Sequence, residues 1–399
     1  MKKVLLSFAV LLMGCALFTA CGDDDDNDNV KPTPQPTPTD STAVDSTDVK
    51  KDTIVYSDGA YIVCAGNQSF SINSGLTYFD YAKGTATSDL FNAVNNKSLG
   101  VTANDGLVYG SKAYLVVDGE AMIDVVDAKT SELLKQISTT ALMGEAEGVN
   151  PRRIAAKDGC IFVSTYGGYV AVIDTVNYEL VAKLQAGSYP EGMAFSGKML
   201  FVANCDYGMG TNPSISIFST DVANKSFRKI IDLKDSLINN PTTLVANGYD
   251  LYILCGDTYE PNPPYKVKQL GGLRKYASGN QGPGAIKNLG SAGIMTAANG
   301  KIFFVDSLYS MPQYKVLNMA NDSISSIEIA EGVDIPNTIG VDPVTGDIIV
   351  AGYVKNGQYG DYTAPGMAIR YDKTGKKLNK FETAVGPTAV FFNTGVKYE

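Results

Sequence analysis

From about residue 54 to its C-terminus, the sequence repeats one pattern every ~40 to 50 residues, and this repeat constrains the fold more than any single motif. The clearest unit is residues 151–187, PRRIAAKDGCIFVSTYGGYVAVIDTVNYELVAKLQAG. It holds a short strand after a proline, a turn at Asp158-Gly159, a second strand, a glycine-rich link, a third strand that ends at Asp174, a polar turn and a fourth strand. Each unit is therefore predicted to form four antiparallel strands.

The same order recurs in PEGMAFSGKMLFVANC, PTTLVANGYDLYILC, IMTAANGKIFFVD and PNTIGVDPVTGDIIVAG. The turns between third and fourth strands give an independent count of seven copies, at 78–84, 125–131, 172–178, 217–223, 275–281, 317–323 and 370–376. Four-stranded units of this length, each covering the faces of its two neighbours, are typical of a β-propeller. We predict an all-β, seven-bladed β-propeller with four-stranded antiparallel blades over residues 54–399.

The two ends of the repeat region complement each other. PTAVFF (387–392) matches the first-strand pattern, but no further strands follow it, whereas the unit around AYIVCAGN lacks a good first strand. The C-terminal strand is therefore predicted to complete the first blade and to close the ring. The chain contains no tryptophan, which separates it from the WD and kelch repeat families.

The N-terminus, MKKVLLSFAVLLMGCALFTACGDDDDND, combines two lysines with an apolar stretch too short to span a bilayer comfortably. Residues 1–20 are interpreted as a signal peptide, and Cys21 as the lipidated cysteine of an ending that resembles a lipobox; Cys15 is the alternative. Residues 21–53 are acidic and then rich in Pro, Thr, Ser and Asp, which predicts a disordered tether. The acidic run at 23–26 resembles the export signal of lipoproteins on the outer face of the Bacteroidetes outer membrane.

Composition argues against several functions. A net charge of −9, with no basic run longer than a pair, makes nucleic acid an unexpected partner. The chain has no histidine, the commonest general base and metal ligand, so we expect no catalytic residue, no metal site and no cofactor. Glu145 and Glu147 are expected to form local ion pairs. The cysteines of the repeat region lie in apolar runs and are expected to be buried without disulfides: Cys64, Cys160, Cys205 and Cys255.

In a propeller, the loops from second to third strands and the loops between blades lie on the same face, around the central channel. The long insertions, such as CGDTYEPNPPYKV (255–267), all follow second strands and should gather on that face. They carry tyrosines among Asn, Gln and Asp, and a tyrosine offers a broad apolar ring with a hydrogen-bonding tip. Either these rings only pack on one another or they bind a ligand, and we predict a ligand site formed by Phe70, Arg152, Tyr166, Tyr189, Glu191, Tyr207, Tyr259, Tyr265, Tyr309, Tyr314, Tyr353 and Tyr362.

The recurring P…DG.IFVS…VAVID pattern and the stretch AGNQSFSINSGLTYFD (65–80) resemble the YncE-like propellers of Bacteroidetes surface lipoproteins. Members of the BtuG type capture cobalamin (vitamin B12) and sit on an outer-membrane TonB-dependent transporter. The resemblance implies a lipid-anchored protein of the outer membrane, facing the cell exterior, that binds cobalamin or a related corrinoid and passes it to such a transporter. The residues also leave open a propeller that binds a glycan or another protein, and a polysaccharide lyase that uses tyrosine and arginine.

Overall fold

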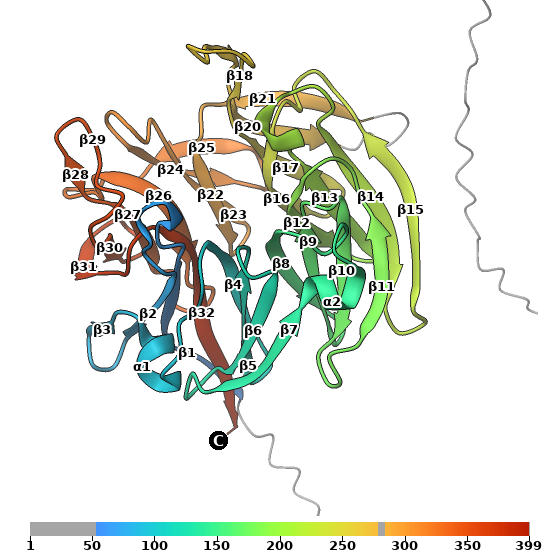
Figure 1. Cartoon of the computed structure of the whole chain (residues 1–399). Helices are drawn as coiled ribbons and strands as arrows, with labels where there is room; N and C mark the ends of the chain where they lie inside the picture. Colours follow the sequence, from blue (N-terminus) through green and yellow to red (C-terminus); the bar gives the residue numbers. More distant parts are fainter. Residues whose placement is uncertain (1–52, 278–283, 399) are drawn as a thin grey trace, which may run out of the picture. The chain divides into compact units, whose positions relative to one another are not determined.

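The computed structural model describes residues 53–277 and 284–398 of the chain. Their strands form seven four-stranded antiparallel sheets, which follow one another around a central axis as the blades of a propeller (Figure 1). This arrangement confirms the all-β, seven-bladed fold that the repeats predict. The predicted signal peptide, the two candidate lipidated cysteines Cys15 and Cys21, and residues 21–52 of the predicted tether lie outside the described residues.

The blades are numbered in chain order, and their strands are given from the channel outward. Blade 1 contains β32 (Pro387–Tyr398), β1 (Thr53–Cys64), β2 (Gly75–Asp80) and β3 (Thr85–Thr87). Blades 2 and 3 contain β4 (Ala103–Tyr109), β5 (Lys112–Val117), β6 (Met122–Asp127) and β7 (Leu133–Ser138), then β8 (Pro151–Lys157), β9 (Cys160–Thr165), β10 (Tyr169–Asp174) and β11 (Leu180–Gln185). Blades 4 and 5 contain β12 (Pro190–Ser196), β13 (Met199–Asn204), β14 (Ser214–Asp221) and β15 (Ser226–Leu233), then β16 (Pro241–Asn247), β17 (Asp250–Cys255), β20 (Gly272–Ala277) and β21 (Ala285–Gly290). Blades 6 and 7 contain β22 (Ile294–Ala298), β23 (Lys301–Asp306), β24 (Gln313–Asn318) and β25 (Ser323–Ser326), then β26 (Ile335–Val341), β27 (Ile348–Tyr353), β30 (Met367–Tyr371) and β31 (Lys377–Glu382).

Several short elements lie in the loops within and between the blades. Two α-helices, α1 (Leu90–Asn95) and α2 (Thr139–Met143), lie in connections between blades, and two 3-10 turns, η1 (Gln68–Phe70) and η2 (Asp206–Gly208), lie in second-to-third loops. Two small hairpins extend the corresponding loops of blades 5 and 7: β18 (Thr258–Tyr259) with β19 (Val267–Gln269), and β28 (Lys355–Asn356) with β29 (Tyr359–Gly360). Within the described part of the chain, no helix has the length and apolar character needed to cross a membrane.

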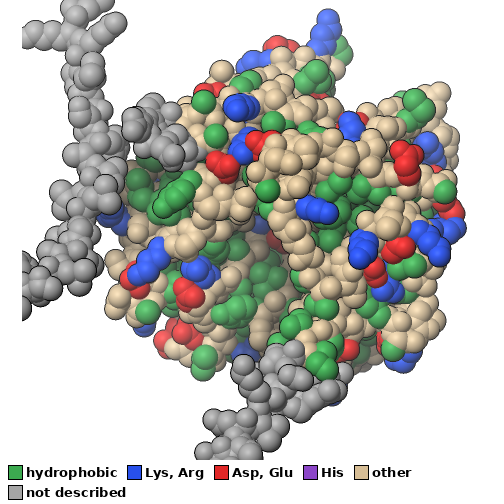
Figure 2. Space-filling model, turned by 180° about the vertical axis from the view of Figure 1, so that it is seen from behind, with side chains coloured by type: hydrophobic (Ala, Val, Ile, Leu, Met, Phe, Trp, Pro, Cys, Tyr) green, Lys and Arg blue, Asp and Glu red, His purple; other side chains and the backbone are tan. Residues whose placement is uncertain are grey.

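The second strands of blades 2 to 7 and the second half of β1 are almost wholly buried, whereas fourth strands such as β15 and β25 are largely exposed. Second strands are runs of β-branched and aromatic residues, which suit a strand that is covered on both faces. Each blade therefore contributes both faces to the core, one against each neighbour. On the face shown in Figure 2, acidic and basic side chains are interspersed among hydrophobic and polar ones.

The ring closes through the C-terminal strand. β32 pairs antiparallel with β1 from Thr53↔Tyr398 to Cys64↔Pro387, so the last strand of the chain becomes the innermost strand of blade 1. The Phe391 ring stacks on the Tyr61 ring, with their centroids 5.1 Å apart. The predicted closure is therefore confirmed, and the two ends of the repeat region share one sheet.

Several inner strands begin with a proline that is followed by a β-bulge. Pro151, Pro190 and Pro241 each open an inner strand, and in all three the strand register shifts within the next three residues. Such a bulge re-aims the side chains that follow it, and the residue after the proline reaches the central channel in several blades. The residues that line the channel at this position, together with Asn104, which follows Ala103 at the start of β4, are called the polar ring: Asn104, Arg152, Thr242, Asn337 and Thr388.

The four described cysteines are free and buried, which confirms the prediction for them. They are Cys64, Cys160, Cys205 and Cys255. Burial raises the pKa of the Cys64 thiol to about 12. It also raises the pKa of Cys205 to about 11, with a further contribution from the negative charge of Glu191.

These thiols are expected to be inert in the folded protein. Because both burial and a raised pKa suppress the reactive thiolate, a thiol-reactive dye at pH 8 should label residues 52–399 about 10² to 10³ times more slowly when folded than when unfolded in guanidinium. The measurement is the rate of dye release, with the unfolded chain as the control for four accessible thiols. One rapidly labelled cysteine in the folded protein would show that its strand end is open.

Candidate functional site

A pocket of about 380 Å³ lies on the face that carries the second-to-third loops. Four tyrosines from three neighbouring blades line it: Tyr166 after β9, Tyr207 in η2, Tyr259 in β18 and Tyr265 in the turn of that hairpin. We call it the tyrosine pocket. Its remaining lining is Glu191, Cys205, Gly208, Met209, Asn240, Thr242, Asp257, Glu260 and Pro261.

The loops that carry these tyrosines are held in unusual backbone conformations. Tyr189, Tyr207 and Tyr265 have φ values of 54°, 53° and 50°, in the left-handed region that side chains with a Cβ seldom adopt. Such residues cost roughly 1 kcal/mol each and persist where surrounding contacts fix them. The Asp206 carboxylate provides such contacts in η2, because its Oδ2 accepts hydrogen bonds from the backbone N–H groups of Thr211 and Asn212, each at 2.8 Å.

The base of the hairpin loop in blade 5 is also fixed. Asp257 Oδ1 accepts a hydrogen bond from Gly271 N at 2.7 Å, across the two ends of the loop. The buried Arg274 guanidinium donates through Nη2 to the carbonyls of Leu270 at 3.2 Å and Gly271 at 3.1 Å. These contacts hold the wall that carries Tyr259 and Tyr265 against the blade.

Three tyrosine rings from blades 3 and 4 pack on one another. The ring centroids of Tyr166 and Tyr189 are 5.0 Å apart at an interplanar angle of 78°, and those of Tyr189 and Tyr207 are 5.1 Å apart. Edge-to-face contacts of this kind add to the stabilisation from burial alone. Tyr166 and Tyr207 pack on neighbouring rings and also border the pocket, whereas Tyr189 does not line it.

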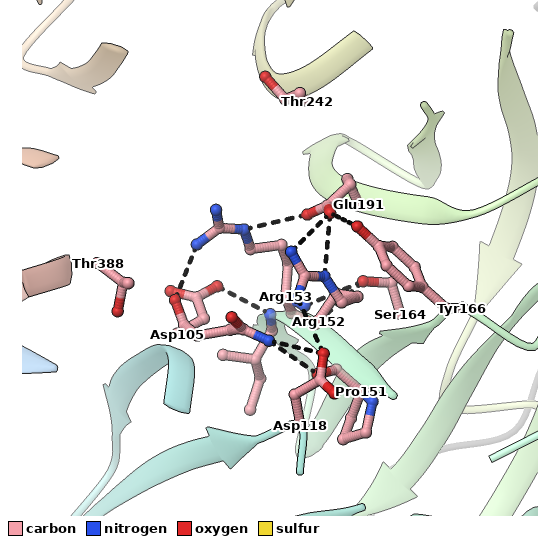
Figure 3. A network of polar contacts seen from close by, with 12 residues as sticks. Asp105, Asp118, Pro151, Arg152, Arg153, Ser164, Tyr166, Glu191, Thr242 and Thr388 are labelled. Carbon is pink, nitrogen blue, oxygen red and sulfur yellow. Dashed lines mark hydrogen bonds and ion pairs between the residues drawn. The ribbon is translucent and has the colours of Figure 1, made fainter. Parts of the chain in front are cut away.

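A network of ion pairs lies behind these rings (Figure 3). Arg152 Nη1 lies 2.9 Å from Asp118 Oδ2, its Nη2 lies 3.0 Å from Glu191 Oε1, and its guanidinium carbon lies 4.5 Å from the centre of the Tyr166 ring. The Tyr166 hydroxyl donates to Glu191 Oε1. Arg153 Nε lies 3.4 Å from the other oxygen of Glu191.

The charges in this network keep the Tyr166 phenol neutral and the Arg152 guanidinium positively charged. Burial raises the pKa of the Tyr166 phenol, and the negative charge of Glu191 raises it further, so the phenol stays protonated and remains a donor. Burial alone would lower the pKa of Arg152, but the carboxylates of Glu191 and Asp118 outweigh it and the pKa is raised. The guanidinium therefore stays charged and paired, and the network forms a rigid back wall for the pocket.

The other predicted tyrosines and Phe70 do not line the tyrosine pocket. Tyr309 lines the central channel, and Tyr353 and Tyr362 form a pair on blade 7 with ring centroids 4.8 Å apart. Phe70 is exposed on the loop of blade 1. Tyr314 is placed differently from its prediction as a loop residue: it is buried in β24, and its hydroxyl accepts a hydrogen bond from Val333 N at 3.2 Å.

Sequence reasoning missed Asp118 and Asn150. Asn150 Nδ2 donates to Asp118 Oδ1, 2.6 Å away, so both belong to the network behind the pocket. Asp118 directly follows the second strand β5, the position that supplies pocket residues in other blades, but the link VDGEA has no aromatic residue to draw attention to it. Of the two glutamates expected to form local ion pairs, Glu147 pairs with Lys183, 36 residues further along the chain, whereas Glu145 is exposed and forms no ion pair within the described residues.

The central channel is a second cavity, of about 530 Å³, lined by residues from the inner strands of all seven blades. The polar ring lies where these strands begin, and the residues further along them are largely apolar, including Ile154, Met193, Leu244, Ile339 and Val390. Thr242 lines both cavities, so the channel and the tyrosine pocket adjoin at blade 5. Within the described ranges, no group of three or more His, Cys, Asp and Glu side chains is placed to hold a metal ion.

Known structures resemble this chain in fold. The RRP9 WD40 repeats superpose with a TM-score of 0.52 at 8% identity, over 72% of this chain and 83% of that chain, a likeness that shows the fold alone. The U3-55K structure gives a TM-score of 0.49 at 9% identity, over 72% and 84% of the two chains, and the computationally designed Ika8 protein gives 0.44 at 11% identity, over 74% and 96%. No curated protein matches the chain. Within the propeller, residues 58–247 match the model of a protein domain described as a domain of unknown function, DUF5074.

Proposed function

We propose that this protein is a non-catalytic, lipid-anchored surface protein of the outer membrane that binds cobalamin or a related corrinoid on its loop face and passes it to a TonB-dependent transporter. The observation that carries this proposal is the tyrosine pocket, in which four tyrosines from three blades surround about 380 Å³ of space. A corrin is a large, flat macrocycle fringed with amides. Tyrosine rings pack on flat apolar surfaces, and their hydroxyl tips exchange hydrogen bonds with amides.

The rigidity of the pocket also supports capture of a ligand. Its walls are held by the ion pairs of Arg152 and by the hydrogen bonds of Asp206 and Asp257. Side chains and loops that are already fixed lose less entropy on binding, so more of the contact energy appears as affinity. A rigid cup of this kind suits a protein that must take up a scarce ligand.

Exposed apolar side chains on the same face as the pocket support contact with a partner. Met311, Tyr359 and Leu270 are 76%, 73% and 70% exposed, and all three lie in second-to-third loops of the pocket face. Large apolar side chains that gather on one face often mark a protein interaction site. On this proposal, the transporter covers the loaded face and receives the ligand from it.

The position of the N-terminal strand sets the geometry of such a contact. β1 enters the described fold at Thr53 and reaches the loop face only at Cys64, so the preceding segment joins the propeller at the opposite face. A 12-residue strand spans about 40 Å. Residues 21–52 have a maximum reach of roughly 100 Å, which is enough for the loop face to turn toward the membrane that carries the lipid.

The tyrosine pocket is tested by removing its rings together. A variant with Tyr207→Ala, Tyr259→Ala and Tyr265→Ala is expected to bind cyanocobalamin about 100-fold more weakly, because each lost ring contact removes ~1 kcal/mol. The measurement is calorimetric titration of residues 52–399. Tyr249→Ala is the matched control, because this tyrosine is 87% exposed in the turn between β16 and β17, on the opposite face. A folded triple variant that binds as tightly as the control would contradict the assignment of the pocket.

A further inference from the structure

The mouth of the central channel contains hydrogen-bonding groups that the tyrosine pocket does not use. The channel and the pocket share Thr242, one residue of the polar ring, and Figure 3 shows Thr242, Arg152 and Thr388 around the network of ion pairs. Further along the inner strands the channel becomes apolar at residues such as Leu244 and Ile339. A substituent that extends from the pocket toward the axis of the propeller therefore meets polar groups first.

At this mouth, the side chains of Arg153 and Asp105 can form further hydrogen bonds with a ligand. They come from the neighbouring inner strands β8 and β4, and both line the channel. Arg153 Nη1 donates to the Asn104 carbonyl at 2.9 Å, and Nε faces Glu191. The Arg153 side chain is 31% exposed, and its Nη2 has no partner among the residues drawn in Figure 3.

The Asp105 carboxyl supplies acceptors beside this donor. Oδ1 accepts a hydrogen bond from Gly106 N at 2.9 Å, and Oδ2 accepts one from Ile154 N at 3.0 Å. Each carboxylate oxygen has two lone pairs, so each can accept a second hydrogen bond. Burial raises the pKa of this carboxyl, and the Arg153 charge opposes part of that increase.

The charged side chains at the channel mouth determine which kind of ligand substituent can bind there. Around the mouth, the guanidinium groups of Arg152 and Arg153 face three carboxylates, those of Asp105, Asp118 and Glu191. A carboxylate placed between Arg153 and Asp105 would lie against the Asp105 carboxylate, and an ammonium group would lie against the Arg153 guanidinium; such repulsions are strong where water is partly excluded. A neutral group that has one acceptor and one donor meets neither repulsion.

We propose that the channel mouth binds a primary carboxamide of the ligand, with the amide oxygen accepting a hydrogen bond from Arg153 Nη2 and the amide NH₂ donating to Asp105. This inference rests on the proposed function, because a corrinoid carries such amides around its edge. It makes Arg153 and Asp105 the residues that distinguish a carboxamide from a carboxylate. The tyrosine rings then supply contact area, and the mouth supplies chemical selectivity.

The test compares cyanocobalamin with derivatives in which one peripheral propionamide has been hydrolysed to a carboxylate. In titrations of residues 52–399, one of these derivatives is expected to bind at least about tenfold more weakly than cyanocobalamin. Asp105→Asn removes this negative charge and should reduce that difference to less than about threefold. Arg153→Gln should weaken cyanocobalamin itself about tenfold. Tyr249→Ala, in the exposed turn between β16 and β17 on the opposite face, is the control and should change neither value.

The outcomes separate this inference from the proposed function. If cyanocobalamin binds tightly and every carboxylate derivative binds equally well, the carboxamide site is wrong and the tyrosine pocket stands. An Asp105→Asn protein that discriminates as strongly as the wild type also contradicts it. If cyanocobalamin does not bind at all, the corrinoid function fails, and the inference fails with it. The comparison of ligands on the wild-type protein needs no variant to fold, and thermal melting identifies any variant that does not.

Discussion

Replacing Glu191 with alanine is expected to destabilise the propeller by about 3 to 5 kcal/mol. The Glu191 side chain is buried, and its two oxygens contact Arg152, Arg153 and the Tyr166 hydroxyl. Removing the carboxylate takes from Arg152 and Arg153 the anion that they share, although Asp118 still pairs with Arg152, and it leaves the Tyr166 phenol without its acceptor. Buried charges without a partner are among the costliest defects in a folded protein.

The measurement for Glu191→Ala is urea unfolding of residues 52–399 followed by tyrosine fluorescence. Glu145→Ala is the matched control, because Glu145 is an exposed glutamate in the same region of the sequence and its loss should change the free energy of unfolding by less than about 0.5 kcal/mol. A loss below about 1 kcal/mol for Glu191→Ala would mean that the network does not hold blades 3 and 4 together.

The second large effect concerns the strand that closes the ring. Phe391→Ala is expected to cost about 3 to 5 kcal/mol, the range found for a buried phenylalanine that leaves a cavity. Phe391 is buried in β32, stacks on Tyr61 of β1, and also packs so closely on Gly106 of blade 2 that a Cβ at Gly106 would lie 2.6 Å from its ring. Its ring therefore joins the closing blade to the next one.

Val396→Ala provides the control for this strand. Val396 lies in the same strand but is exposed, so its truncation should change the free energy of unfolding by less than about 0.5 kcal/mol. Both variants are measured by thermal and urea unfolding. If Phe391→Ala proves as mild as Val396→Ala, the ring does not depend on β32 for its stability, and the closure of blade 1 contributes little.

The fold could be predicted from the sequence because its information is local and repeated. Every blade carries a proline or apolar start, a buried second strand and a polar turn after the third strand, and each of these features is readable within a few residues. Ring closure followed from the same pattern, since a first strand was missing at one end of the repeats and left over at the other. Seven repetitions make an error in one unit unimportant.

The site could be predicted only in part, because loop backbones and side-chain directions are not repeated. The topology places Tyr166, Tyr207, Tyr259 and Tyr265 on one face, but their meeting in one pocket depends on η2 and the β18–β19 hairpin. Tyr314 shows the limit most clearly. The alternation of β24, with Gln313 exposed and Tyr314 buried, already begins inside the stretch that reads as a loop, so this tyrosine faces the core.

The polar residues around the channel were even harder to recognise from the sequence. Asp105 and Thr242 are ordinary strand residues in the sequence, and they reach the channel only because the inner strands bulge near their beginnings. Arg152 and Glu191 were recognised because the repeat places them at the connections between blades, on the same face as the long loops. Their partner Asp118 was missed because it lies in a short turn.

Corrinoid capture is tested by calorimetric titration of cyanocobalamin into residues 52–399. We expect saturable one-to-one binding with a Kd below about 1 μM, which corresponds to a binding free energy beyond about −8.2 kcal/mol. The absence of any saturable heat at that concentration, from a protein that melts cooperatively, would contradict it. The glycan and protein-docking functions would then be the ones to test on the same face.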